Sequence, residues 1–147
     1  MIIRKALISD FKTMYRIGRQ TPEMQVNYND PFMERDDFRS RILDKTNVFL
    51  VAEEDDKIIG FICANASDKD RPLKDEWACL VYIVVIPEFR KHGIATLLYN
   101  ECTKTLKKRG ITHLYALADG NTQAIQNFLK KAGFRTGKKI VWMDRKL

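Results

Sequence analysis

The stretch "WACLVYIVVIPEFRKHGIATLLYN", residues 77–100, decides the fold of this chain. Its first ten residues are apolar on both faces of an extended segment, which predicts a strand in the middle of a sheet, covered on both sides. From Gly93 onward the apolar residues recur with helical spacing, which predicts a helix over residues 93–110. The face of this helix that we expect to be buried consists of Ile94, Leu97, Leu98, Cys102 and Leu106.

The turn between this strand and this helix, "PEFRKHG" at residues 87–93, places two basic residues and a histidine directly before a helix start. The first N–H groups of a helix have no partner inside the helix, and the helix dipole adds a partial positive charge at the same end. Gly93 and Ala95 are small enough to let a ligand approach the backbone. The turn therefore predicts an anion site, although neither GxxxxGK[ST] nor GxGxxG occurs in the chain.

Hydrophobic periodicity predicts the remaining elements. We expect strands over residues 1–7, 47–54, 57–67, 111–118 and within 135–147, and helices over residues 9–18, 33–45 and 121–134. Ser9 or Asp10 is expected to cap the first helix, and the acidic residues Asp55 and Asp56 are expected to join two strands in an antiparallel hairpin. This order of elements predicts an α/β domain built on a mixed sheet with helices on both faces.

Length and composition indicate one globular domain over residues 1–147, with 45% hydrophobic residues and a net charge of +7. The chain has no run of about 20 apolar residues and no signal-peptide pattern at its start, so we expect a cytoplasmic protein. Cys63, Cys79 and Cys102 are widely spaced within apolar segments, which favours buried thiols. The two histidines are far apart and no Cys/His cluster occurs, so we expect no metal site.

The pattern R-x-x-G-x-A at residues 90–95, behind "VVIPEF", resembles the acetyl-CoA signature of the GCN5-related N-acetyltransferase (GNAT) family. The segment "GNTQAIQNFLKKAGF", residues 120–134, is similar to the second motif of that family, and "IVWMDRKL", residues 140–147, to its last strand. The resemblance covers nearly the whole chain and is weakest over residues 19–46. It implies a mostly antiparallel α+β sheet that splays apart where acetyl-CoA binds.

The resemblance also implies which residues bind acetyl-CoA. The backbone of Ile83, Val84 and Val85 would pair with the pantetheine arm. The pyrophosphate would lie against the backbone of residues 90–96, with Arg90 and Thr96 assisting. The cofactor residues expected in this turn are Arg90, Lys91, His92, Gly93, Ile94, Ala95 and Thr96, and the residues expected beside the thiol are Asn121 and Phe128. From the residues alone, Asn121 could equally cap its helix, and Phe128 could belong to the core.

The reaction implied by the resemblance is direct attack of an amine on the thioester, which requires a route for the amine proton and an acid for the thiolate. The family often has a carboxylate at the position of Cys79 or Val81, and this chain has none there. Glu76 is the nearest acid and the first candidate for the general base, although an exposed carboxylate at a strand end is the favoured explanation for it. Tyr115 is a candidate for the missing acid, as an alternative to a packing role.

The amine acceptor is expected against residues 22–37, where Glu34, Asp36 and Asp37 would attract a cation, unless these acids only complement a helix dipole. A peptide α-amine needs about 3 kcal/mol less than a lysine to become neutral at pH 7, which favours a low-pKa amine. Two other functions stay open, namely a non-catalytic acyl-CoA-binding regulator and, less favoured, a nucleic-acid-binding module suggested by "KTLKKRG" at residues 104–110. The expected partners are acetyl-CoA and an amine, with no membrane, and a homodimer is left open.

Overall fold

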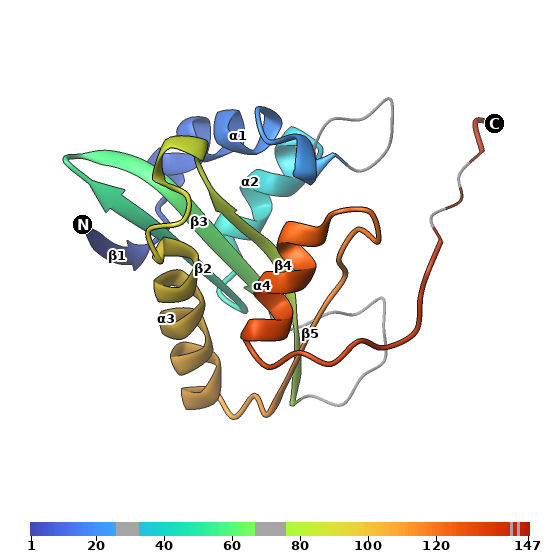
Figure 1. The fold of residues 1–147 in the computed structure, drawn as a ribbon. Helices are drawn as coiled ribbons and strands as arrows, with labels where there is room; N and C mark the ends of the chain where they lie inside the picture. Colours follow the sequence, from blue (N-terminus) through green and yellow to red (C-terminus); the bar gives the residue numbers. More distant parts are fainter. Residues whose placement is uncertain (26–32, 67–75, 142, 144) are drawn as a thin grey trace. The chain divides into compact units, whose positions relative to one another are not determined.

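The computed structural model describes residues 1–25, 33–66, 76–141, 143 and 145–147. These residues form two compact units, Met1–Leu117 and Ala118–Leu147. The first unit contains the sheet and three of the helices, and the second contains one helix (Figure 1). No helix in the described ranges combines the length and the apolar content that a bilayer span requires.

The first unit is built on one five-stranded sheet whose spatial order follows the chain, β1-β2-β3-β4-β5. The strands are β1 (Ile2–Lys5), β2 (Asn47–Glu54), β3 (Lys57–Asn65), β4 (Trp77–Val85) and β5 (His113–Ala116). The first three pairings are antiparallel, and β4 pairs with β5 in parallel. The expected mixed, mostly antiparallel sheet is therefore confirmed.

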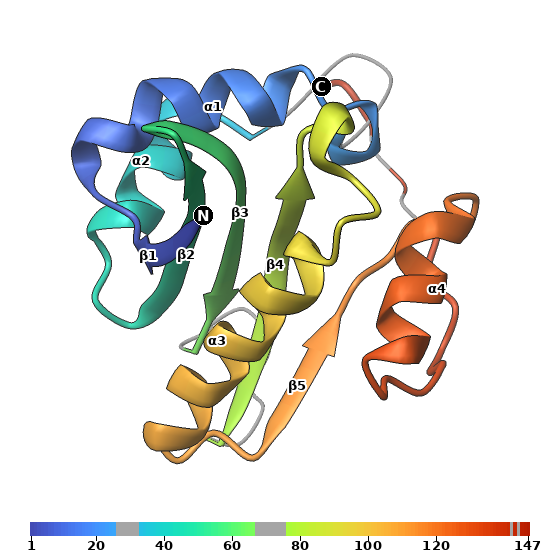
Figure 2. The ribbon, with the colours of Figure 1, turned by 60° about the vertical axis from the view of Figure 1, so that its left-hand side comes forward.

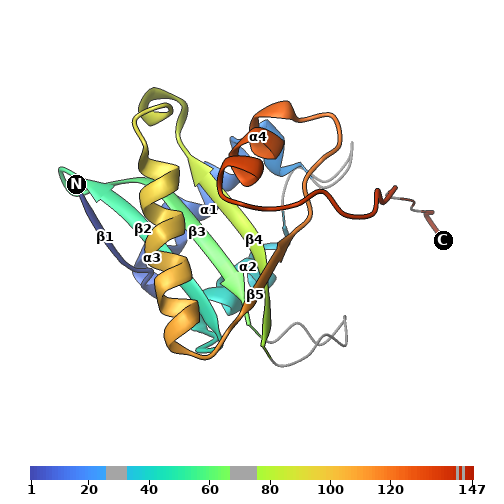
Figure 3. The ribbon, with the colours of Figure 1, turned by 60° about the horizontal axis from the view of Figure 1, so that its bottom comes forward.

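Helices cover both faces of this sheet, as expected. Helices α1 (Phe11–Arg19) and α2 (Arg35–Leu43) lie on one face, and α3 (Ile94–Lys108) lies on the other, against β2, β3 and β4 (Figures 2 and 3). Three short 3-10 helices, η1 (Ile8–Asp10), η2 (Pro22–Met24) and η3 (Pro87–Phe89), form parts of the connections. Antiparallel strands can be joined by tight turns, whereas the parallel β4–β5 step needs a crossover, which α3 provides.

The core between the sheet and α1 and α2 is aromatic. The ring of Phe38 from α2 is 0% exposed and lies at 5.6 Å from Phe49, 6.0 Å from Phe61 and 5.9 Å from Tyr82, measured between ring centroids. Such aromatic pairs stabilise a core beyond the area they bury. Phe38 therefore joins α2 to three neighbouring strands.

The opposite face is closed by aliphatic residues of α3. Ile94, Leu98, Cys102 and Leu106 are buried there, as their helical spacing predicted. Leu97 is 43% exposed, so its assignment to this face was wrong. It follows Ile94 by three positions and lies at the margin of the apolar stripe, where the helix already turns toward solvent.

The sequence placed two features of the sheet incorrectly. The middle strand is β3, and β4 is the fourth of five, with alternate residues from Trp77 to Ile83 only half-buried. The last strand expected within residues 135–147 is absent from the residues of that range that the structure describes, namely 135–141, 143 and 145–147. Val141 is 81% exposed there. Strand propensity is local, but a strand also needs a neighbouring edge to pair with.

Asp10 does not cap α1 through its side chain, contrary to expectation. Its carboxylate accepts a hydrogen bond from the Leu7 N–H at 2.8 Å and forms an ion pair with Arg4 at 2.7 Å. The Arg4 guanidinium also contacts the Glu53 carboxylate through its Nε at 2.9 Å. Arg4 thus ties β1 both to β2 and to the start of α1. The expected hairpin of β2 and β3 does form, with Asp55 and Asp56 at positive φ in the turn.

The second unit contains α4 (Gln123–Lys131). The helix is followed by a glycine in the left-handed region, Gly133 with φ of 91°. The N–H groups of Gly133 and Phe134 donate to the carbonyls of Lys130 and Leu129 in the last turn. These bonds satisfy carbonyls that the helix itself leaves without a partner.

Candidate functional site

The sheet opens between β4 and β5. The two strands pair from Trp77–His113 to Leu80–Ala116, and beyond this point β3 is the one described strand that pairs with β4. Figure 2 shows the two strands moving apart in this region. The second half of β4 therefore presents an unpaired backbone edge, where the sequence predicted a splayed sheet.

The hydrogen-bonding pattern between β3 and β4 decides which backbone groups of β4 point toward that open edge. The Ile86 N–H donates to the Ile59 carbonyl at 3.0 Å, in the same register that pairs Val84 with Phe61. Hydrogen-bonded and non-hydrogen-bonded pairs alternate along antiparallel strands, so the backbone of Val84 bonds to β3. The N–H and C=O groups of Ile83 and Val85 consequently point toward the open edge. Of the three residues expected to pair with a ligand backbone, Val84 thus has its backbone groups bonded to β3, and the carbonyl of Val85 accepts a hydrogen bond from the Arg90 side chain.

A β-bulge interrupts β4 at the start of this open edge. Cys63 pairs with Tyr82 and Ala64 with Leu80, which leaves Val81 with no counterpart on β3. A bulge rotates the strand locally and changes where its backbone groups point. No local pattern predicts this bulge, because Val81 belongs to an unbroken apolar run.

The turn after β4 has an unusual backbone. Lys91 and Gly93 have φ angles of 66° and 80°, and α3 begins immediately afterwards at Ile94. A Cβ atom at Gly93 would meet no atom within 4 Å. The glycine is therefore required for its left-handed conformation rather than for space within the free protein.

The N–H groups of residues 91–96 have no hydrogen-bond acceptor within the part of the chain that the structure describes. The first bond of α3 runs from the Leu97 N–H to the Gly93 carbonyl at 3.1 Å. Lys91, His92 and Thr96 are exposed, and Ala95 is half-buried. Free N–H groups, a helix N-terminus and exposed positive charge together form a site suited to an anion such as a pyrophosphate.

The guanidinium of Arg90 has two partners within the first unit, and its expected role at the pyrophosphate stays a prediction. Its Nε donates to the Val85 carbonyl at 2.9 Å, and its Nη1 lies 3.0 Å from the Glu23 carboxylate in η2. The sequence pointed to Arg90 as a helper for phosphate, and it gave no sign of Glu23, which is 67 positions away. Only the folded chain brings these two residues together.

Asn121 and Phe128 belong to the second unit, and their expected place beside the thiol of a cofactor stays a prediction. The helix cap is Thr122 rather than Asn121. The Asn121 N–H and the Thr122 hydroxyl both donate to the Asp119 carboxylate, at 2.8 and 3.0 Å. Phe128 is half-buried in α4. Asn121 therefore does not perform the capping role that was its alternative interpretation.

Glu76 lies far from the turn that contains Gly93. It is exposed and directly precedes β4, five positions before the bulge at Val81, a separation of about 16 Å along a strand. A general base must come within about 3 Å of the proton it removes, directly or through a water molecule. The structure does not bring Glu76 to the open edge. Its backbone carbonyl instead accepts the N–H groups of Thr112 and His113 at 2.9 and 3.1 Å, at the start of β5.

Other groups with acid–base chemistry lie nearer to the open edge. Cys79 pairs with Tyr115 one position before the β4–β5 ladder ends. The Tyr82 hydroxyl donates to the sulfur of Met33 at 3.1 Å, and burial raises the pKa of this phenol well above its usual value. Burial also raises the pKa of the Cys102 thiol to about 12 and that of the Cys63 thiol further. These two cysteines are buried thiols, as predicted, and Cys79 is half-buried.

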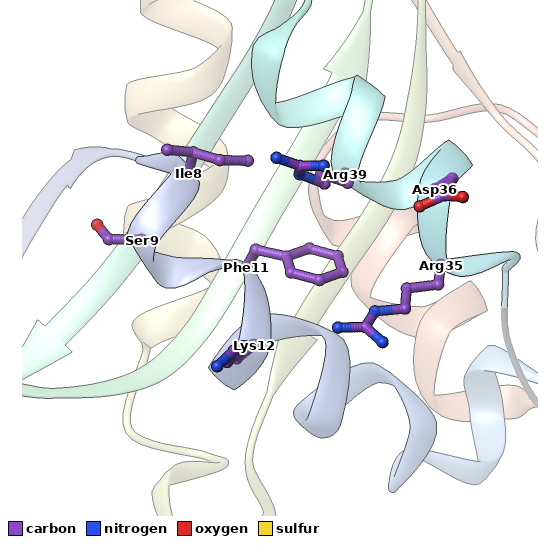
Figure 4. A pocket seen from close by; sticks show the side chains of 7 residues that line it. All are labelled: Ile8, Ser9, Phe11, Lys12, Arg35, Asp36 and Arg39. Atoms are coloured by element: carbon purple, nitrogen blue, oxygen red, sulfur yellow. The ribbon is translucent and has the colours of Figure 1, made fainter.

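The hollows on the surface of the first unit include one beside α1 and α2 and one beside the turn. The larger has a volume of about 630 Å³ and is formed by η1, α1 and α2, with Arg35 at 5.6 Å from the ring of Phe11 (Figure 4). Its lining residues are Ile8, Ser9, Phe11, Lys12, Arg35, Asp36 and Arg39. Three cations against one carboxylate would repel a protonated amine. The smaller hollow, of about 400 Å³, borders the turn through Glu88, Phe89, His92 and Ile94.

The region expected to receive an acceptor lies partly outside the described residues, which omit residues 26–32. Of its three acids, Asp36 and Asp37 occupy the first turn of α2 and Glu34 directly precedes that helix. Acids in these positions are stabilised by the helix dipole, which was their alternative explanation.

Comparison with known proteins gives consistent results. Residues 7–134 match the sequence family described as the Acetyltransferase (GNAT) family. An uncharacterised N-acetyltransferase of Methanocaldococcus jannaschii is 36% identical over 88 residues, a match that spans 58% of this chain and 38% of that relative. This chain thus spans well under half of that relative's length.

Solved structures share the fold. A mutant protein of Bacillus halodurans superposes with a TM-score of 0.82 at 18% identity, covering 99% of this chain and 100% of the other. A PaiA N-acetyltransferase of Thermoplasma acidophilum, solved with coenzyme A, gives a TM-score of 0.71 at 22% identity, covering 95% and 92% of the two chains. At these identities the likeness shows the fold alone.

Proposed function

The chain belongs to the GNAT acetyltransferase family, whose members take acetyl-CoA as acetyl donor, and we propose that it transfers the acetyl group directly to an amine. One observation carries this proposal. The unpaired edge of β4 leads directly into a turn whose N–H groups, at residues 91–96, have no acceptor among the described residues. A ligand with an amide-bearing arm followed by a pyrophosphate matches both features in that order.

The donor would be bound mainly by backbone groups. The outward N–H and C=O groups of Ile83 and the outward N–H of Val85 would pair with the amides of the pantetheine arm as a neighbouring strand does, while the Val85 carbonyl keeps its bond from the Arg90 Nε. The N–H groups from Lys91 to Thr96 would receive the pyrophosphate, with the dipole of α3 behind them. Asn121 and Phe128 would lie near the thiol, as the family motif implies.

The chemistry requires a neutral amine, stabilisation of the oxyanion and a proton for the departing thiolate. We expect β4 backbone N–H groups beside the bulge at Val81 to face the thioester carbonyl. Tyr115, which pairs with Cys79, is the proposed acid. With Glu76 remote from this edge, a base would have to act through several water molecules, which favours an amine of low pKa such as a peptide α-amine. A lysine or a small amine remains the alternative acceptor.

A second function is favoured by one specific observation. The described part of β4 carries no carboxylate near the bulge, since Cys79 and Val81 occupy the positions where the family often has one. A protein that binds acyl-CoA without catalysing acetyl transfer would not need a carboxylate at these two positions. Tight cofactor binding without turnover of any amine would support this regulatory function.

Calorimetry with acetyl-CoA tests the proposal, using the wild type and Gly93→Asp. We expect micromolar binding that is lost in the variant, because the new carboxylate would repel the pyrophosphate. Gly110→Asp is the matched control, since Gly110 has a φ of 83° and open space around it at the other end of α3. Absence of binding to the wild type would refute the acetyltransferase function, and equal loss in both variants would refute the assigned location.

A further inference from the structure

The guanidinium of Arg90 makes two interactions within the first unit, one through Nε and one through Nη1. Its Nε donates to the carbonyl of Val85, the last residue of β4, and its Nη1 forms an ion pair with Glu23 at 3.0 Å. The backbone N–H of Arg90 also donates to the Pro87 carbonyl at 3.1 Å. Arg90 therefore connects three parts of the first unit, namely the end of β4, η3 and the segment that follows α1.

The position of Arg90 in the chain gives these contacts their importance. The next residue, Lys91, adopts a left-handed backbone conformation that costs a non-glycine residue free energy, and Gly93 adopts the same conformation two positions later. Such a turn keeps its shape only when its surroundings fix it. The hydrogen bond from Arg90 to Val85 fixes the point at which the turn leaves the strand.

The carboxylate of Glu23 decides whether the Arg90 side chain stays in this place. A guanidinium without a partner would move toward solvent or toward a bound anion. The fixed fork of an arginine holds its position best when several of its donors are engaged at once. Hydrogen bonds from its own backbone N–H and from Arg90 lower the pKa of the Glu23 carboxyl, which keeps it charged at neutral pH.

We infer that Glu23 is a positioning residue for the pyrophosphate turn and that it acts through Arg90, which braces the turn against β4 instead of binding phosphate. This inference rests on the proposed function of the turn. It assigns a role to a residue outside both motifs, contributed by η2 in the segment after α1. The sequence pattern that identified Arg90 suggested the opposite role for it.

The two roles predict opposite results for the loss of Glu23. Coenzyme A is a polyanion, so removal of a nearby carboxylate should strengthen binding if electrostatics alone mattered, and it should free Arg90 to contact phosphate. If Arg90 is a brace, removal of the carboxylate loosens the turn and weakens binding. The sign of the change in affinity therefore separates the two roles.

The experiment is calorimetry of coenzyme A with Glu23→Ala, Glu23→Gln and Glu88→Ala. We expect Kd to rise about two- to fivefold in Glu23→Ala, the range set by a half-exposed ion pair. Glu23→Gln keeps an oxygen acceptor for Arg90 and should recover most of the affinity. Glu88→Ala removes a carboxylate of η3 with no ion pair in the described ranges, and should leave Kd unchanged or lower it.

A double variant completes the test. In a chain that already carries Arg90→Ala, the change Glu23→Ala should no longer weaken binding, because it acts only through Arg90. Tighter binding in the single variant Glu23→Ala, or equal weakening with and without Arg90, would overturn the inference.

Hydrogen exchange of the free protein separates this inference from the proposed function. The hydrogen-bonded amides that flank the turn, those of Phe89, Arg90 and Leu97, should exchange faster in Glu23→Ala than in the wild type or Glu88→Ala, with no cofactor present. Unchanged exchange rates of these amides in Glu23→Ala would overturn the inferred positioning role of Glu23. If the wild type bound no coenzyme A while the exchange still differed, the brace would stand and only the proposed function would fail.

Discussion

The aromatic core under α1 and α2 and the turn between β4 and α3 are built on opposite principles. In the core the side chains make the structure, and Phe38 touches rings from three strands while being 0% exposed. In the turn the backbone makes the site, through two left-handed residues and a row of N–H groups without acceptors. Substitutions in the core should therefore change stability, and substitutions in the turn should change cofactor binding.

The largest effect should come from the core. Phe38→Ala should lower the free energy of unfolding by about 3–5 kcal/mol, because it removes a buried ring and leaves a cavity. Denaturant unfolding measures this loss. Leu43→Ala on the same helix, where the side chain is 59% exposed, should cost far less. If the folded fraction of Phe38→Ala lost cofactor affinity, the two regions would not be independent.

A smaller effect is expected from the ion-pair cluster at the edge of the core. Asp10→Asn should destabilise the protein by about 1–3 kcal/mol at pH 7, because it removes the charged partner of Arg4. Hydrogen bonds from Arg4 lower the folded-state pKa of Asp10. Its contribution to stability is thus present above the unfolded pKa of about 3.9 and is lost as pH falls through the lower folded pKa.

Urea unfolding between pH 2 and 7 tests this dependence. The wild type should lose stability as the pH falls below about 4, and Asp10→Asn should lack that part of the loss. Asp56→Asn, at an exposed turn residue that tolerates asparagine, is the control and should keep the wild-type profile. Parallel curves for the wild type and Asp10→Asn would show that Asp10 contributes nothing through its charge.

The smallest effect on stability should come from the turn itself. Gly93→Ala should cost about 1 kcal/mol, because alanine is disfavoured at a φ of 80° although its Cβ would touch nothing within 4 Å. Gly137→Ala has the same open space without the positive φ and should be neutral. Thermal unfolding and calorimetry with coenzyme A should show a modest stability loss beside a clear loss of affinity. A large loss of stability with unchanged affinity for coenzyme A would contradict the division between the two regions.

Much of the fold could be predicted because local periodicity reflects burial. The segments around Phe38 and Leu98 were correctly assigned to helices, and the hairpin at Asp55 and Asp56 was correctly placed. The order of the strands was harder to predict, since the strand expected in the middle of the sheet, β4, is the neighbour of the middle strand β3. The strand expected within residues 135–147 also shows the limit, because pairing requires an edge that no local pattern describes.

The sequence by itself determined the turn between β4 and α3, since a basic segment and a glycine before an apolar helix specify a turn with the local chemistry suited to an anion. Only the tertiary structure decided which backbone groups of β4 are available, because this depends on its register against β3 and on the bulge at Val81. It also decided that Arg90 is bound to Glu23. Local conformation follows from neighbouring residues, whereas register and distant ion pairs depend on how the whole chain packs.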